Sequence, residues 1–131
     1  MTVDRSLIGR ESEPVVYEVE RGAIRKFADA IGDSNPVYQR GDVAPPTFPT
    51  TFRVDIPGLS FDLKRCLHGG EEYTYARPIR AGDRITVVRR VKDIYQREGS
   101  LGLMTFYILE SEGKDPDGNL VFTGRSTIIV R

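Results

Sequence analysis

The second half of the sequence is dominated by runs in which apolar and polar side chains alternate, the pattern of a β-strand with one buried face. Short connections join the last three runs, and the connection at residues 113–119 contains the strong turn sequence Asp-Pro-Asp-Gly-Asn. Strands joined by such short turns lie side by side and run antiparallel. We therefore predict an antiparallel sheet, with strands over residues 72–76, 84–95, 104–111 and 120–130.

The longest of these predicted strands changes phase midway. Ile85, Val87 and Val91 share one face, whereas Val88 and Ile94 fall out of phase with them. One extra residue in a strand shifts every later side chain to the opposite face, so this change predicts a β-bulge.

The first part of the chain carries a strand pattern followed by a helix pattern. Residues 14–20 alternate, which predicts a further half-buried strand. From Ile24 to Ile31 an apolar residue then recurs every three or four positions, which predicts a helix over residues 21–31. Gly32 ends this helix, because glycine readily adopts the left-handed conformation that closes a helix.

A second, shorter helix is predicted between two loops, with Thr47 as its N-cap. Phe48, Phe52 and Ile56 are spaced by four residues and would share one face of it, and a Pro-Gly pair follows directly. The prolines near its start are compatible with a first helical turn, where the backbone amides have no intrahelical partner.

Together these elements predict one α+β domain over residues 1–131, an antiparallel sheet of about five strands with one or two helices on one face. A chain of 131 residues is long enough for one core but not for two. An open sheet of this kind has two edge strands that must be covered or paired.

The composition excludes several function classes. Lysine plus arginine equals aspartate plus glutamate, 19 each, so no basic surplus indicates a nucleic-acid partner. Cys66 and His68 are the only residues of their types and cannot form a tetrahedral zinc site, so we predict no metal. No run approaches the roughly 20 apolar residues that span a bilayer, and no signal peptide is evident. We expect a cytoplasmic protein without membrane contact.

The sequence from Gly32 to Tyr38, Gly-Asp-Ser-Asn-Pro-Val-Tyr, follows the predicted helix as a tight turn. One interpretation is purely structural, because Asp and Asn side chains bond the backbone two residues further on. The sequence also resembles the hydratase motif of MaoC-like dehydratases, including (R)-specific enoyl-CoA hydratases, which reads Gly-Asp-x-Asn-Pro, an aliphatic residue and a histidine. The likeness to the N-terminal, dehydratase-like branch extends over residues 67–73, 77–83 and 124–127 and so covers most of the chain.

This resemblance implies a hot-dog fold, in which the sheet wraps around a central helix. It implies an activity on acyl thioesters of coenzyme A or acyl carrier protein, with no separate cofactor. Hot-dog chains also pair their sheets edge to edge, which implies a homodimer or a heterodimer with a second hot-dog chain.

The resemblance further implies that Asp33, Asn35 and Tyr38 occupy the catalytic positions. In the family an Asp and a His orient and deprotonate the water that adds to an enoyl thioester. Here Asp33 and Asn35 match the motif, but Tyr38 stands where the family has histidine. A phenol, with a pKa near 10, is a poor base at neutral pH, although it can donate or relay a proton.

Substrate-binding positions are predicted at Pro46, Thr47, Phe48 and His68. Catalytic family members have a His-Gly pair before the central helix, and the glycine amide binds the thioester oxygen. Prolines occupy the corresponding region here and lack an amide hydrogen, so Thr47 is the remaining donor. His68, the only imidazole, is predicted to have a structural role in a loop, with catalysis as the alternative.

Other charged residues have two interpretations each. Arg77, Arg80 and Arg84 form either a solvated turn cluster or a site for coenzyme A phosphates or for an acidic carrier protein. Asp83 is predicted as a turn residue. Asp55, on the predicted central helix, is where hot-dog thioesterases carry a carboxylate.

Three functions from different classes remain open. The first is a hydro-lyase on 3-hydroxyacyl or enoyl thioesters, either as a homodimer using Asp33 with Tyr38 or as one subunit of a heterodimer whose partner supplies the histidine. The second is a noncatalytic acyl-thioester-binding chain that partners a catalytic MaoC-like chain. The third is a thioesterase using Asp55. We favour the first, in its heterodimer form.

Overall fold

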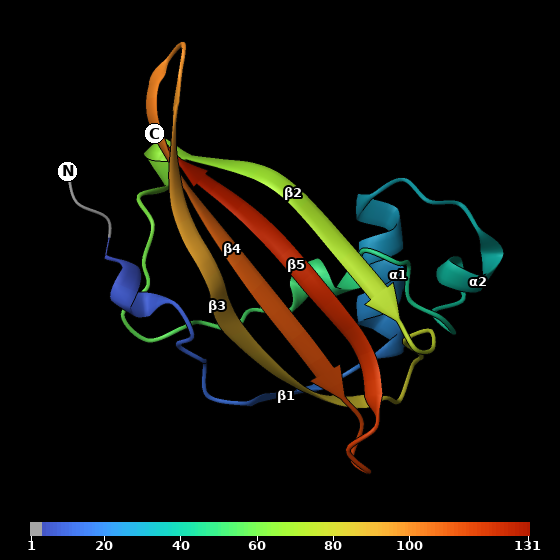
Figure 1. The fold of residues 1–131 in the computed structure, drawn as a ribbon. Helices are drawn as coiled ribbons and strands as arrows, with labels where there is room; N and C mark the ends of the chain where they lie inside the picture. Colours follow the sequence, from blue (N-terminus) through green and yellow to red (C-terminus); the bar gives the residue numbers. More distant parts are fainter. Residues whose placement is uncertain (1–3) are drawn as a thin grey trace.

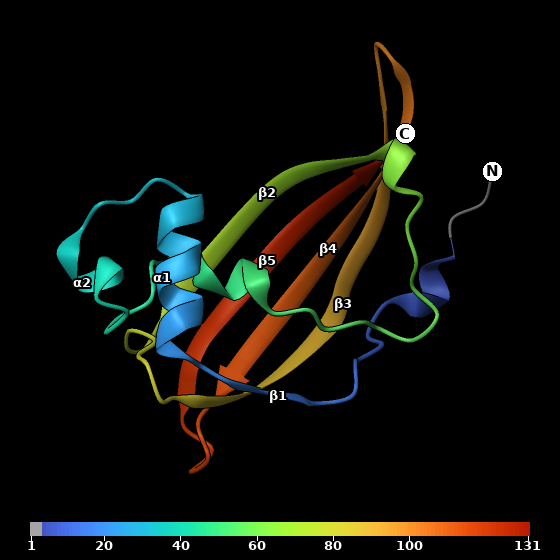
Figure 2. The ribbon, with the colours of Figure 1, turned by 180° about the vertical axis from the view of Figure 1, so that it is seen from behind.

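The computed structural model describes residues 4–131 and consists of one twisted five-stranded antiparallel sheet whose concave side is covered by helical segments (Figures 1 and 2). The spatial order of the strands is β1-β3-β4-β5-β2, which leaves β1 and β2 at the edges. Their bounds are β1 Val15–Glu18, β2 Cys66–Tyr75, β3 Arg84–Gly99, β4 Gly102–Lys114 and β5 Leu120–Val130. The α+β prediction and the antiparallel sheet are confirmed.

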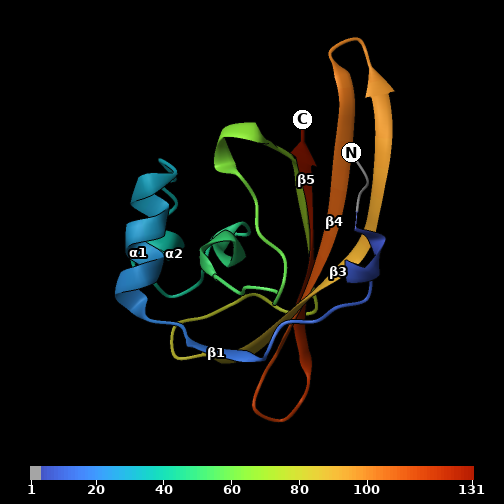
Figure 3. The same cartoon turned by 90° about the vertical axis from the view of Figure 1, so that its left-hand side faces the viewer.

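Two α-helices and three single 3₁₀ turns complete the described chain. They are α1 Arg21–Ala30, α2 Pro36–Gln39, η1 Arg5–Leu7, η2 Phe48–Thr51 and η3 Leu63–Arg65. Figure 3 shows α1, η2 and the sheet as successive layers, with η2 in the middle. No helix in residues 4–131 is long and apolar enough to cross a membrane.

The helix predicted over residues 47–56 is wrong in extent, because the structure forms only the single turn η2 there. Pro49 has no amide hydrogen to continue a helical ladder. The hydroxyls of Thr50 and Thr51 donate to the carbonyls of Thr47 and Phe48, at 2.8 and 2.9 Å, and such side-chain bonds compete with helix propagation. Residues 52–56 have no regular secondary structure, so the centre of the domain holds one turn in place of a full helix.

A row of aromatic rings connects the three layers. Phe27 of α1 meets Phe48 of η2 edge to face at 5.6 Å between ring centroids, and Phe48 meets Phe52 in the same way at 5.6 Å. Phe52 in turn lies 6.1 Å from Phe122 of β5. Because each such pair adds about 0.5–1.5 kcal/mol beyond its buried area, this row fixes η2 between helix and sheet.

The sheet confirms the predicted bulge and extends three of the predicted strands, β2, β3 and β4. The pairing of β3 with β4 shifts register between Val91 and Asp93. Strand β2 begins at Cys66, six residues earlier than predicted, so His68 lies in an edge strand and not in a loop. Its pairing with β5 also shifts, between His68 and Gly70.

Candidate functional site

The predicted catalytic turn follows α1 in a closely hydrogen-bonded form. Gly32 adopts a φ of 70°, and the amides of Gly32 and Asp33 donate to the carbonyls of Asp29 and Ala28, at 3.1 and 2.9 Å. This pair of bonds is a Schellman motif, which closes the last turn of a helix. The prediction that Gly32 ends the helix is confirmed.

The polar side chains of this turn bind the backbone nearby. The Asp33 carboxylate accepts from the Asn35 amide at 2.9 Å, and the Asn35 side chain accepts from the Val37 amide at 3.1 Å, which caps α2. Both bonds are the Asx-turn interactions of the structural interpretation. Tyr38 lies in α2 and is half-buried.

Three predicted substrate-binding residues lie at the start of η2. The Pro46 carbonyl accepts from the Tyr75 hydroxyl, and Phe48 is only 3% exposed within the aromatic row. The exposed Thr47 contributes its carbonyl to Thr50, and its own amide donates to no protein acceptor within residues 4–131. Thr47 is therefore the residue of this segment whose amide remains available to a ligand.

A cavity of about 290 Å³ lies between η2 and the concave face of the sheet. One part of its wall is apolar, formed by Pro49, Phe52, Val54, Val87 and Phe122. The other part is polar, formed by Thr50, His68, Glu71, Tyr73, Arg89, Ser111 and Ser126. Of the predicted site residues, only His68 lines this cavity. The residues of the turn around Asp33 do not line it.

The polar wall is a chain of hydrogen bonds across β3, β5 and β2. The Arg89 guanidinium donates to the Ser126 hydroxyl at 3.1 Å, and that hydroxyl donates to Glu71 Oε1 at 2.6 Å. His68 Nε2 lies 2.9 Å from the same carboxylate oxygen. We call these four residues the polar chain.

Burial changes the acidity of two groups around this chain. Burial lowers the pKa of the Arg89 guanidinium, and the nearby Glu71 carboxylate opposes that change. Arginine nevertheless remains charged at neutral pH. Burial, together with the adjacent Glu71, raises the pKa of the Tyr73 phenol, so Tyr73 stays neutral. The cavity wall therefore holds a cation, a carboxylate and a neutral phenol.

Sequence reasoning missed Arg89, Glu71 and Ser126. A signal for Arg89 was present, because it occupies the same phase as the buried Ile85, Val87 and Val91. A charged residue at an inward position of a strand indicates either a buried ion pair or a polar site. The partner of Arg89 depends on which strands lie beside β3 and in what register. The local sequence pattern does not reveal this.

Asp55 does not lie on a helix. It is exposed in the extended segment after η2, although its charge is close enough to raise the pKa of Arg89. The premise of the thioesterase interpretation, a carboxylate on a central helix, is therefore wrong for this chain.

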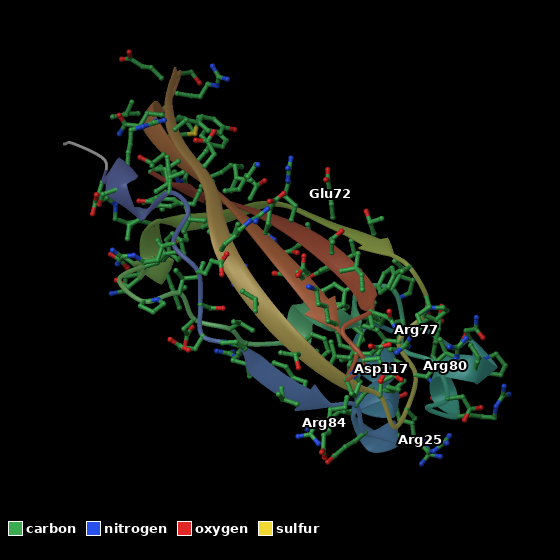
Figure 4. The ribbon with its side chains drawn as sticks, turned by 60° about the horizontal axis from the view of Figure 1, so that its bottom comes forward. Arg25, Glu72, Arg77, Arg80, Arg84 and Asp117 are labelled. Carbon is green, nitrogen blue, oxygen red and sulfur yellow. The ribbon has the colours of Figure 1, made fainter. Side chains whose placement is uncertain are left out.

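The arginines between β2 and β3 gather at one end of the molecule with Arg25 of α1 (Figure 4). Arg77 pairs with Asp83 at 2.8 Å, and the same carboxylate oxygen accepts from the Arg80 amide at 2.8 Å. The turn role of Asp83 is thus confirmed.

The outer face of the sheet carries a larger, more open hollow of about 450 Å³ around Glu110. Arg90 and Arg125 each bind a Glu110 oxygen, at 2.9 and 3.0 Å, and these bonds hold the pKa of that carboxyl below its usual 4.5. The charges of Arg90, Glu110 and Arg125 in this hollow are therefore paired with one another. Among residues 4–131, no group of three or more His, Cys, Asp or Glu side chains is placed to hold a metal ion.

Comparisons with known proteins place these features in context. A family model described as the FAS1-like dehydratase domain region matches residues 6–124. A UPF0336 protein of Streptomyces coelicolor is 36% identical over 149 aligned positions, covering 100% of this chain and 97% of that protein.

Two solved structures share the fold. A chain of the HadBC (3R)-hydroxyacyl-ACP dehydratase complex from Mycobacterium tuberculosis superposes with a TM-score of 0.73 at 21% identity, covering 94% of this chain and 96% of that chain. A MaoC-like dehydratase from Rhodospirillum rubrum superposes with a TM-score of 0.64 at 20% identity, covering 94% and 91%. At these identities the superpositions establish the hot-dog fold.

Proposed function

This chain belongs to the family of FAS1-like dehydratase-region proteins, and from that premise we propose that it is one subunit of a hot-dog hydro-lyase acting on acyl thioesters. The resemblance to MaoC-like dehydratases is confirmed. The reaction is the addition of water to a trans-2-enoyl thioester of coenzyme A or acyl carrier protein, or its reverse from the (3R)-hydroxyacyl thioester.

One observation carries the subunit form of this proposal: the chain has a cavity beside η2, but its hydratase-motif residues do not line it. The Asp33 carboxylate is engaged by the Asn35 amide, and Tyr38 replaces the expected histidine. A general base must be within hydrogen-bond reach of the proton it removes. In this proposal the Asp-His pair therefore comes from a partner chain, and this chain contributes the cavity.

The partner is a second hot-dog chain that joins at strand β2. That strand is at the edge of the sheet, so its outer amides and carbonyls are available for pairing. A heteromeric dehydratase such as the HadBC complex provides the precedent for two hot-dog chains in one enzyme. The single turn η2 leaves room for an acyl chain where a longer helix would fill the centre.

The test is reconstitution with a hot-dog chain that carries an intact Asp-His motif and co-purifies with this one. The assay follows loss of the enoyl-thioester absorbance with a short enoyl-CoA, and free thiol in parallel. We expect hydration by the complex and none by either chain alone. The Asp-to-Asn change in the partner's motif is expected to abolish activity, whereas Asp33→Asn leaves the rate within about twofold, because asparagine also forms an Asx turn.

Different outcomes separate the alternatives. Hydration by this chain alone, lost in Asp33→Asn, would establish the homodimeric enzyme and refute the subunit proposal. Thiol release would indicate a thioesterase. A complex that forms and binds enoyl-CoA without turnover would leave only a noncatalytic acyl-thioester-binding chain.

A further inference from the structure

The β-bulge in β2 brings two polar side chains to the same face of the sheet. In a regular strand, residues three positions apart point to opposite faces. The register shift between His68 and Gly70 inserts Gly69 as an extra residue, so His68 and Glu71 both face the concave side. A Cβ at Gly69 would lie 2.9 Å from the terminal methyl of Ile129, so a larger residue in the bulge requires that side chain to shift.

The polar chain leaves two hydrogen-bonding atoms without a protein partner. Glu71 Oε2 and Arg89 Nε are both buried, and neither has a partner within residues 4–131. One is an acceptor and the other a donor. A buried polar atom without a partner costs about 1–3 kcal/mol, more when the group is charged. Both residues line the cavity, so a ligand bound there is one source of the missing bonds.

The polar chain is a poor match for a plain hydrocarbon. An alkyl chain in the cavity would exclude water from Arg89 and Glu71 and offer them no hydrogen bond, which is unfavourable. The opposite wall, including Phe52 and Val54, is apolar and suits methylene groups. The cavity therefore fits an apolar chain that carries one polar group.

We propose that this cavity binds an apolar chain bearing a group that both donates and accepts a hydrogen bond, a hydroxyl or a secondary amide, held between Glu71 and Arg89. The group donates to the Glu71 carboxylate and accepts from the Arg89 guanidinium. Because both free atoms are buried in the unliganded chain, binding includes a small rotation of both side chains.

If the proposed function holds, two parts of an acyl thioester could carry this hydrogen-bonding group. A hydroxyl belongs to a hydroxyacyl group, and a secondary amide belongs to the pantetheine arm of coenzyme A or acyl carrier protein. A pantetheine amide held here stays outside the proton transfer assigned to the partner. A hydroxyl held here must likewise be one on the acyl chain other than the 3-hydroxyl that leaves in dehydration.

The experiment uses the sole histidine as a reporter. His68 lines the cavity and contacts Glu71, so its imidazole resonance in the isotope-labelled chain reports on this site alone, even in a complex with an unlabelled partner. Three probes of similar size are titrated: methyl 3-hydroxyhexanoate, N-methylhexanamide and methyl hexanoate. The first carries a hydroxyl, the second a secondary amide, and the third neither.

We expect the hydroxyl or the amide probe to shift the His68 resonance and to bind about tenfold or more tightly than methyl hexanoate. Preference for the hydroxyl probe identifies the acyl group as the source, and preference for the amide probe identifies the pantetheine arm. Equal affinity for all three probes, or no shift with any of them, overturns the proposal.

Matched substitutions test the residues. Glu71→Gln is expected to weaken the preferred probe about tenfold, because the amide cannot replace a charged acceptor. Glu72→Gln is the control, since Glu72 is the next residue but lies on the outer face of the sheet, in the hollow around Glu110 (Figure 4). Equal loss in both variants overturns the assignment to Glu71. If Glu71→Gln does not fold, the comparison of probes on the unaltered chain still decides.

The result of the probe titration is independent of the result of the hydration assay. Probe binding at His68 without hydration by any reconstituted complex refutes the proposed function alone. Hydration by the complex without any probe preference refutes this inference alone.

Discussion

Replacing Arg89 by leucine removes the guanidinium of the polar chain, which is linked to Glu71 through the Ser126 hydroxyl. Breaking a fully buried ion pair by removing one partner costs about 3–5 kcal/mol. Here Glu71 keeps its bonds to Ser126 and His68, and its side chain is 21% exposed, so the penalty is smaller. We expect Arg89→Leu to lower the free energy of unfolding by about 2 kcal/mol.

The double variant Arg89→Leu with Glu71→Leu supplies the sharper test. Arg89 and Glu71 are linked through the Ser126 hydroxyl, and removing both charges avoids leaving either one buried alone. The double variant should therefore be more stable than the sum of the two single changes by about 2 kcal/mol. The control is Arg90→Leu, the next residue on the outer face. Its ion pair with Glu110 is half-exposed, so its loss should cost under about 1 kcal/mol.

Urea denaturation of the four variants and the parent chain measures these free energies. Additivity of the two single changes within about 0.5 kcal/mol would mean that Arg89 and Glu71 do not interact. That result would refute the reasoning that the polar chain is one coupled unit.

Two further predictions concern the core and the outer face. Phe122 is 1% exposed and contacts the rings of Phe52 and Tyr75, so Phe122→Ala should cost about 3–5 kcal/mol in urea denaturation, and a cost under 1 kcal/mol would contradict this packing. The pKa of Glu110 is lowered on folding, so its contribution is present above about pH 4.5 and lost as the pH falls through the folded value. Stability should therefore decline by under about 1 kcal/mol in that acid range, and Glu110→Gln should remove this part of the decline.

Local sequence determined the regular elements. The helix ending at Gly32, the strand over residues 120–130 and the bulge after Val91 were all predicted and confirmed. Each depends on residues close together in the chain, because side-chain periodicity, turn chemistry and glycine conformation are local properties. The motif turn belongs to the same class, since the structural interpretation of its Asp and Asn side chains describes the bonds they make.

Tertiary structure decided where the cavity lies and which residues line it. The sequence suggested a full helix after Thr47, but hydroxyl bonds and Pro49 limit it to one turn, which leaves part of the concave face open. The hydrogen-bonded link from Arg89 through Ser126 to Glu71 depends on the register of β3, β5 and β2. The contact of His68 with Glu71 depends on the extra residue at Gly69. Register is set by pairing between segments far apart in the chain, so side chains that meet across a sheet are not evident from either strand alone.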